Sequence, residues 1–169
     1  MTHNKEKDAP TFRNSMDSKT EAVTEIMLTI FRINGRLLEK GDALVETLGI
    51  ASAQWQVLGA VSLAEKPLSA PKIAEAMGIT RQGVQKQLNQ MLKENLFEKR
   101  PNPHHEKSSL YWPTPKGQRV YSEAMRREAL WARRLAEDLS GPGLQETLGL
   151  LNKFLHLLDL PLPDEGGRR

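Results

Sequence analysis

The sequence has 169 residues, with 24 Lys and Arg, 21 Asp and Glu, and a formal net charge of +3. This length suits one domain with appendages or one domain with a dimerisation region, and the absence of cysteine excludes disulfides, thiolate metal sites and cysteine-based redox sensing. No apolar run is long enough to span a membrane and the N-terminus lacks the apolar core of a signal peptide, so we expect a cytoplasmic protein without membrane contact.

The charged side chains are unevenly distributed along the chain. Residues 66–119 hold 10 basic and 4 acidic side chains, whereas residues 1–65 hold 7 and 9. Neutralised phosphates and released counterions supply most of the non-specific affinity for DNA, so a basic middle part between near-neutral ends is typical of a DNA-binding protein. A solvated basic surface is the alternative, but its charges would be scattered more evenly.

The N-terminal part of the chain predicts a polar tail and one long helix. Residues 1–17 are polar and aperiodic, which indicates a disordered tail. Residues 18–48 carry a wide apolar face at helical spacing, and Gly41 is a point where this helix would bend or break. So broad an apolar face needs more than one partner to cover it.

A second, shorter helix is expected next. Gly49 ends the long helix, and Ser52 is the predicted N-cap of a helix over residues 53–63. Trp55 and its apolar neighbours would face inward, because large aromatic side chains dominate buried area.

Residues 68–96 predict two helices separated by a glycine, which is the pattern of a helix-turn-helix. Ser69 is the predicted N-cap of the first helix. Gly78 would end that helix in the left-handed conformation, and Ile79 would return to the core. Thr80 would cap the second helix, whose apolar positions lie on one side: Val84, Leu88, Met91 and Leu92.

The free side of the second helix carries residue types that read DNA bases. Arg and Lys bond guanine O6 and N7, Gln bonds adenine N6 and N7, and the first turns of this helix enter the major groove in the motif. The side chains concerned are Arg81, Gln82, Gln85 and Lys86. Gly83 stands among them, and close approach of a nucleic-acid backbone is one explanation for a glycine inside this helix. The alternative is a solvated polar face on an ordinary helix pair.

A short hairpin is predicted directly after the second helix. Residues 97–100 and 110–112 favour strands, and the polar segment between them favours a loop. A hairpin at this place is a wing, from which Arg100 and Lys107 would reach phosphate or the minor groove.

Two more helices are predicted after the wing. Thr114 would cap a helix that begins at Pro115 and runs to about residue 139. Residues 140–143 break the pattern, and the last helix carries leucines at alternating spacings of four and three. The rest of the chain offers too little apolar surface to cover both this stripe and the apolar face of residues 18–48, which predicts a homodimer.

Four segments carry a family resemblance: Gln54–Leu58, Ile73–Gln82, Arg100–Pro103 and Leu110–Gly117, the last ending in Thr114-Pro115-Lys116-Gly117. In this order and spacing, over residues 20–158, the chain resembles the MarR family (multiple antibiotic resistance regulator) of winged helix-turn-helix transcriptional regulators. Each segment is weak by itself, whereas their order is fairly specific.

The resemblance implies a mainly α fold with a small β-hairpin wing. Residues 18–160 would form one unit, with dimerisation helices over 18–48 and 115–160 and a winged helix-turn-helix lobe over 52–114, followed by a tail over 161–169. The implied protein is a homodimeric regulator, a repressor rather than an activator, that binds a pseudo-palindromic duplex and responds to a small molecule.

The resemblance also assigns DNA contacts by position. These are Thr80, Arg81, Gln82, Gln85 and Lys86 on the second helix, with Ser69 and Lys72 on phosphates. The sequence departs from the family at the wing tip. Family members usually have an Asp there and an Arg two residues later, whereas this sequence has His105 and Lys107. Lys lacks the planar fork of Arg, so this departure weakens the case for minor-groove reading by the wing.

For a ligand, the family layout would place Phe31, Arg32 and Trp55 around a cleft between the dimer region and the lobe. Arg32 would be the partner of a carboxylate. We therefore expect an aromatic or anionic effector.

Other chemistries find less support in the sequence. A solvated wing tip is the preferred interpretation of His104, His105 and Glu106, because zinc needs three or four ligands and no others lie nearby in sequence. The sequence has no nucleotide-binding loop and no nucleophile motif, and it has no paired carboxylates in an apolar context. We therefore expect no cofactor, no metal and no enzymatic activity. The main rival is a dimeric protein-interaction module whose winged lobe does not bind DNA.

Overall fold

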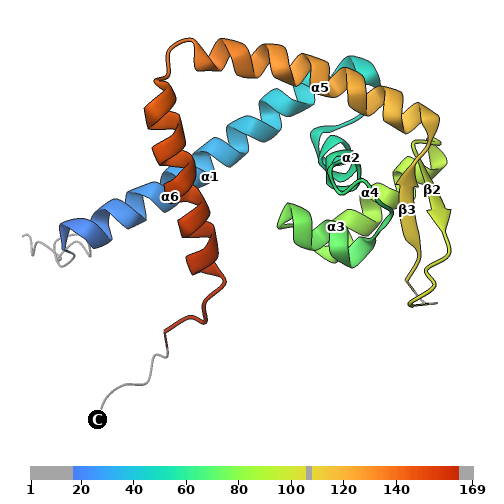
Figure 1. Cartoon of the computed structure of the whole chain (residues 1–169), viewed down its shortest axis with the longest axis horizontal. Coiled ribbons are helices and arrows are strands. Elements are labelled where there is room, and N and C mark those ends of the chain that lie inside the picture. The colour runs from blue at the N-terminus through green and yellow to red at the C-terminus, as the bar shows by residue number, and fades with distance from the viewer. Residues whose placement is uncertain (1–16, 106–107, 164–169) are drawn as a thin grey trace, which may run out of the picture. The chain divides into compact units, whose positions relative to one another are not determined.

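A computed structural model describes residues 17–105 and 108–163 (Figure 1). Its elements are α1 (Ser18–Val45), the short 3-10 helix η2 (Glu46–Leu48), α2 (Ser52–Leu63), β1 (Leu68–Ser69), α3 (Ala70–Met77), α4 (Arg81–Lys93), β2 (Phe97–Arg100), β3 (Leu110–Pro113), α5 (Pro115–Ala136) and α6 (Gly141–Leu158). The predicted fold class, mainly α with a small β structure, is confirmed. The helix predicted to run to residue 139 ends at Ala136.

The predicted tails fall largely outside the described residues, as does Lys107 at the wing tip. Asp17, which was predicted to belong to the N-terminal tail, is the N-cap of α1. Its Oδ1 atom accepts hydrogen bonds from the N–H groups of Lys19 at 3.0 Å and Thr20 at 3.1 Å. The ordered helix therefore begins with a side-chain cap.

The described residues form two compact units that divide between Ala124 and Met125. The first unit holds α1 to β3 and the start of α5, and its core lies where α2, α3, α4 and the sheet pack on one another. Ile73 of α3 and Val84, Leu88 and Met91 of α4 are fully buried there. The apolar stripe predicted for residues 84–92 is therefore the inner side of α4.

The sheet has three strands in the order β1-β3-β2, all antiparallel. The predicted hairpin is confirmed, with Phe97 opposite Pro113 and Arg100 opposite Leu110. The third strand, β1, was not predicted, because two residues carry no readable alternation.

Two predictions for the start and end of α3 were wrong. Ser69 holds the N-cap position but its side chain makes no capping bond, because it lies in β1 and Pro71 removes one of the N–H groups that a cap would bond. Ile79 is 37% exposed instead of buried. Its backbone N–H bonds Ala74 O at 3.1 Å in the turn after Gly78, which takes the left-handed conformation as predicted.

The junction of α1 and α2 also differs from the prediction. α1 runs through Gly41 without interruption, and this glycine is buried where Ser52 and Trp55 of α2 approach. Ser52 is the first residue of α2 and not its cap. The N–H of Ser52 donates to Asp42 Oδ1 at 2.7 Å, which holds the pKa of this carboxyl below its ordinary value. A side chain of α1 thus caps α2.

Thr114 caps α5 as predicted. Its Oγ1 atom accepts from the N–H of Gly117 at 3.1 Å and donates to Asn95 O at 2.7 Å. Gly117 is buried against the Leu96 carbonyl, so the start of α5 packs on the turn between α4 and β2.

Large apolar side chains stay exposed above all on α1 and α6, and Leu130 and Leu135 of α5 are exposed as well. On α1 they include Leu28, Phe31, Ile33 and Leu37, and α6 has no buried residue although leucines dominate it. Within the part of the chain that the structure describes, no helix is both long and apolar enough to cross a membrane. Because their apolar side chains stay exposed, the faces of α1 and α6 are candidates for contact with another protein chain.

Candidate nucleic-acid interface

The N-terminal half of α4 presents a polar face that no other described element covers. Arg81, Gln82 and Lys86 are exposed, while Val84 and Leu88 on the opposite side are fully buried. Thr80 caps the helix as predicted, with Oγ1 accepting from the N–H of Gly83 at 3.1 Å. The exposed side chains therefore project from the first turns of a firmly anchored helix.

The capping interaction of Thr80 explains the presence of a glycine at position 83. A Cβ atom at this position would lie 3.1 Å from Thr80 Oγ1, which is a tight contact. Glycine thus accommodates the capping hydroxyl, whereas its predicted role in the approach of a nucleic-acid backbone stays a prediction.

Two predicted phosphate contacts flank α4 on α3 and β1. Lys72 is exposed and forms an ion pair with Glu75, 2.7 Å from Nζ to Oε2. The hydrogen bond from Lys72 lowers the pKa of the Glu75 carboxyl, which is therefore charged at neutral pH. Ser69 is half-buried in the sheet. Of these two residues, Lys72 is the more accessible.

The base of the wing restrains Arg100. Its guanidinium pairs with Glu98 on the same strand, 2.7 Å from Nη2 to Oε1, and lies 5.4 Å from the centre of the Trp112 ring. A contact with phosphate would have to compete with this ion pair. The predicted contact at Lys107 lies outside the described residues, and His105 is exposed at the tip.

Gln85 differs from the other predicted base-reading residues, because it is half-buried and hydrogen-bonded. Its Nε2 atom donates to Asn89 Oδ1 at 2.9 Å and to Tyr111 Oη at 3.3 Å. Asn89 and Tyr111 were not among the predicted site residues. The spacing of four residues on a helix could have indicated Asn89, but nothing in the sequence pairs Gln85 with a strand residue 26 positions away.

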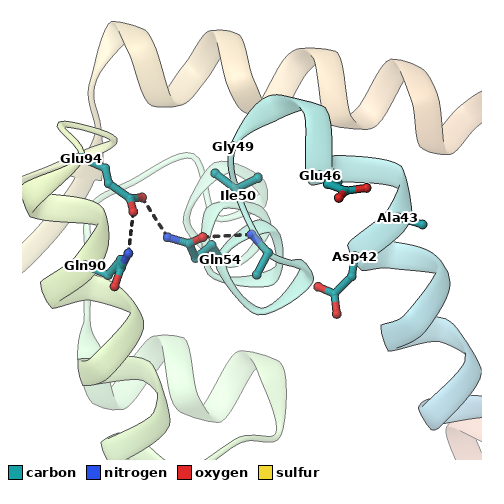
Figure 2. A pocket seen from close by; sticks show the side chains of 9 residues that line it. Asp42, Ala43, Glu46, Gly49, Ile50, Gln54, Gln90 and Glu94 are labelled. Carbon is teal, nitrogen blue, oxygen red and sulfur yellow. Dashed lines mark hydrogen bonds between the residues drawn. The ribbon is translucent and has the colours of Figure 1, made fainter.

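An open hollow of about 550 Å³ lies between the end of α1, the start of α2 and the end of α4. Figure 2 shows Asp42 and Glu46 on one side and Gln90 and Glu94 on the other, with Gln54 between them. Gln54 Nε2 donates to Glu94 Oε2 at 2.9 Å, and its Oε1 accepts from the N–H of Ala51. All charged side chains that line this hollow are acidic, so it does not favour an anionic ligand.

The residues predicted for a ligand cleft are not brought together within one chain. Phe31 is 73% exposed, and Trp55 packs instead at Gly41 of α1. These two places on α1 are separated by roughly 15 Å along the helix axis. Neither of them nor Arg32 lines the hollow of Figure 2.

The chain is similar to proteins of a known family. A model of the MarR family matches residues 48–108. The uncharacterized protein Rv2011c of Mycobacterium tuberculosis is 31% identical over 144 residues, which are 85% of this chain and 99% of the relative.

Solved structures of similar fold agree with the family match. A mutant MarR of Escherichia coli complexed with operator DNA has a TM-score of 0.70 at 18% identity, covering 83% of this chain and 99% of that one. Staphylococcus aureus MarR in complex with salicylate and kanamycin has a TM-score of 0.66 at 19% identity, covering 83% and 95%. At these identities the likeness concerns the fold.

Proposed function

Because this chain belongs to the MarR family of DNA-binding transcription regulators, we propose that it is a homodimeric repressor. In this proposal the dimer binds a pseudo-palindromic operator, and a small molecule lowers its affinity for that operator. The uncovered polar face at the start of α4 carries this proposal. Arg81, Gln82 and Lys86 project there from a capped helix, in the most basic part of the chain.

In the proposed complex, the first turns of α4 enter the major groove. Arg81 bonds the O6 and N7 atoms of a guanine, and Gln82 and Lys86 contact neighbouring base edges. Lys72 on α3 contacts a phosphate and sets the position of the helix. The backbone contacts supply most of the affinity and the base contacts supply the sequence preference.

The proposed homodimer rests on the uncovered apolar faces of α1 and α6. A second copy of the chain would cover these apolar faces, and the dimer would then present two copies of α4. Two copies of α4 reach successive major grooves of one duplex if they lie about 34 Å apart. A pseudo-palindromic operator then follows from the two-fold symmetry of the dimer.

The proposed effector acts by population shift. A small molecule that binds better to a dimer with a different spacing of the two lobes lowers the population that fits the operator. The Staphylococcus aureus relative, which was solved with salicylate, supports an aromatic acid as the first class to test. Phe31, Arg32 and Trp55 stay the predicted pocket residues, to be tested in the dimer.

A gel-shift assay tests the proposal. We expect the purified protein to retain duplex DNA from near its own gene, with an affinity that falls steeply as salt rises, and the retained fragments to share an inverted repeat. A panel of aromatic acids should then release the DNA.

The absence of any salt-dependent shift would favour the rival function, a dimeric protein-interaction module. A shift that no acid of the panel weakens would contradict the proposed class of effector and leave DNA binding intact.

The Lys72–Glu75 ion pair leads to a further prediction. The Glu75→Gln variant should bind specific and random DNA about threefold more tightly, because it frees Lys72 and removes a carboxylate that repels phosphate. Fluorescence anisotropy at several salt concentrations measures this change. Glu39→Gln is the matched control, because Glu39 also forms an exposed pair, with Arg36 on α1. Equal effects of the two substitutions would show that only net charge matters.

A further inference from the structure

The carboxamide of Gln85 is held in one orientation by two neighbours. Asn89, one turn further along α4, accepts one hydrogen bond from Nε2 at 2.9 Å. Tyr111 of β3 accepts the other at 3.3 Å. Tyr111 is only 4% exposed and belongs to the core, so its hydroxyl is fixed in place by the packing of the sheet.

This arrangement uses both donor hydrogens of Gln85. A carboxamide has two N–H hydrogens and one carbonyl oxygen. Within the described part of the chain, Gln85 Oε1 has no hydrogen-bond partner. The group that Gln85 can offer to a base is therefore an acceptor.

Building on the proposed function, we infer that Gln85 reads its base through Oε1 alone and that Tyr111 is a positioning residue for this contact. A free Gln bonds both N6 and N7 of adenine, which requires a donor as well as an acceptor. Without the donor, Gln85 selects a base with an exocyclic amino group in the major groove, which adenine N6 and cytosine N4 both provide. Guanine and thymine present acceptors at that place and are disfavoured.

The experiment begins with selection of preferred sites from random duplex DNA. The position that loses its preference in Gln85→Ala is the position that Gln85 reads. There the wild-type protein should favour adenine and cytosine over guanine and thymine by about fivefold, as expected for one hydrogen bond. Replacing adenine with 7-deazaadenine at this position should leave the affinity of the wild-type protein unchanged, because N7 is not bonded.

The Tyr111→Phe variant supplies the decisive comparison. It frees one hydrogen of the carboxamide, so Gln85 can add the bond to N7. Its preference for adenine over cytosine should rise by about fivefold, and 7-deazaadenine should abolish that gain. A thermal melt checks that the variant folds. Asn89→Ala is the second variant, because it frees the other hydrogen at an exposed position.

Gln90→Ala is the matched control on the same helix, because Gln90 is exposed, bonds Glu94 and is not among the predicted DNA contacts, and this variant should keep the preference at the Gln85 position. A loss of wild-type affinity with 7-deazaadenine, a preference for guanine or thymine, or unchanged preferences in both freed variants would overturn the inference while the proposed function stands. Selection of no sequence at all would overturn both.

Discussion

The Gly117→Ala variant is expected to lose about 3 kcal/mol or more of its free energy of unfolding. A Cβ atom on Gly117 would overlap the carbonyl oxygen of Leu96, closer than real Cβ atoms approach any backbone atom. This carbonyl cannot move away freely, because it accepts the N–H of Thr114 at 3.0 Å. Denaturant unfolding followed by circular dichroism measures the loss.

Gly59→Ala is the matched control for this prediction. Gly59 also lies within a helix, but its added Cβ would meet only a ring carbon of Tyr121 at 3.7 Å, which is ordinary contact. We expect this variant to be neutral or to gain up to about 1 kcal/mol, because alanine favours a helix over glycine. If Gly117→Ala unfolded at the same denaturant concentration as Gly59→Ala, the close contact at Leu96 would not exist in the protein.

The second large effect is expected from Arg81→Ala, which should weaken binding to the preferred site by about 1–3 kcal/mol and relax the base preference at one position. Arg81 is exposed at the first position of α4 and has no ion-pair partner among the described residues. Its guanidinium is therefore available for a guanine. Competition assays with the preferred site and its single-base variants measure both changes.

Lys72→Ala provides the comparison for Arg81→Ala. A phosphate contact carries no sequence information, so this variant should weaken binding to all sequences alike and make the affinity less sensitive to salt. If Arg81→Ala lowered the affinity for the preferred site and for random DNA equally, Arg81 would contact the backbone and not a base.

The sequence by itself determined the local features of the winged helix-turn-helix. Gly78, Thr80 and Thr114 take the end and cap positions predicted for them, because each cap needs only atoms three or four residues apart. The buried and exposed sides of α4 followed from a periodicity that the helix imposes on its own side chains. These features depend on the neighbours along the chain.

Tertiary structure decided the features that join residues distant in sequence. The side chain that caps α2 is the carboxylate of Asp42 on α1 and not the hydroxyl of Ser52, and the two residues of β1 are a strand only because β3 lies beside them. Likewise Tyr111, and not the helix alone, orients Gln85. Hydrogen bonds of this kind depend on where separate elements pack, and no local propensity or spacing encodes that placement.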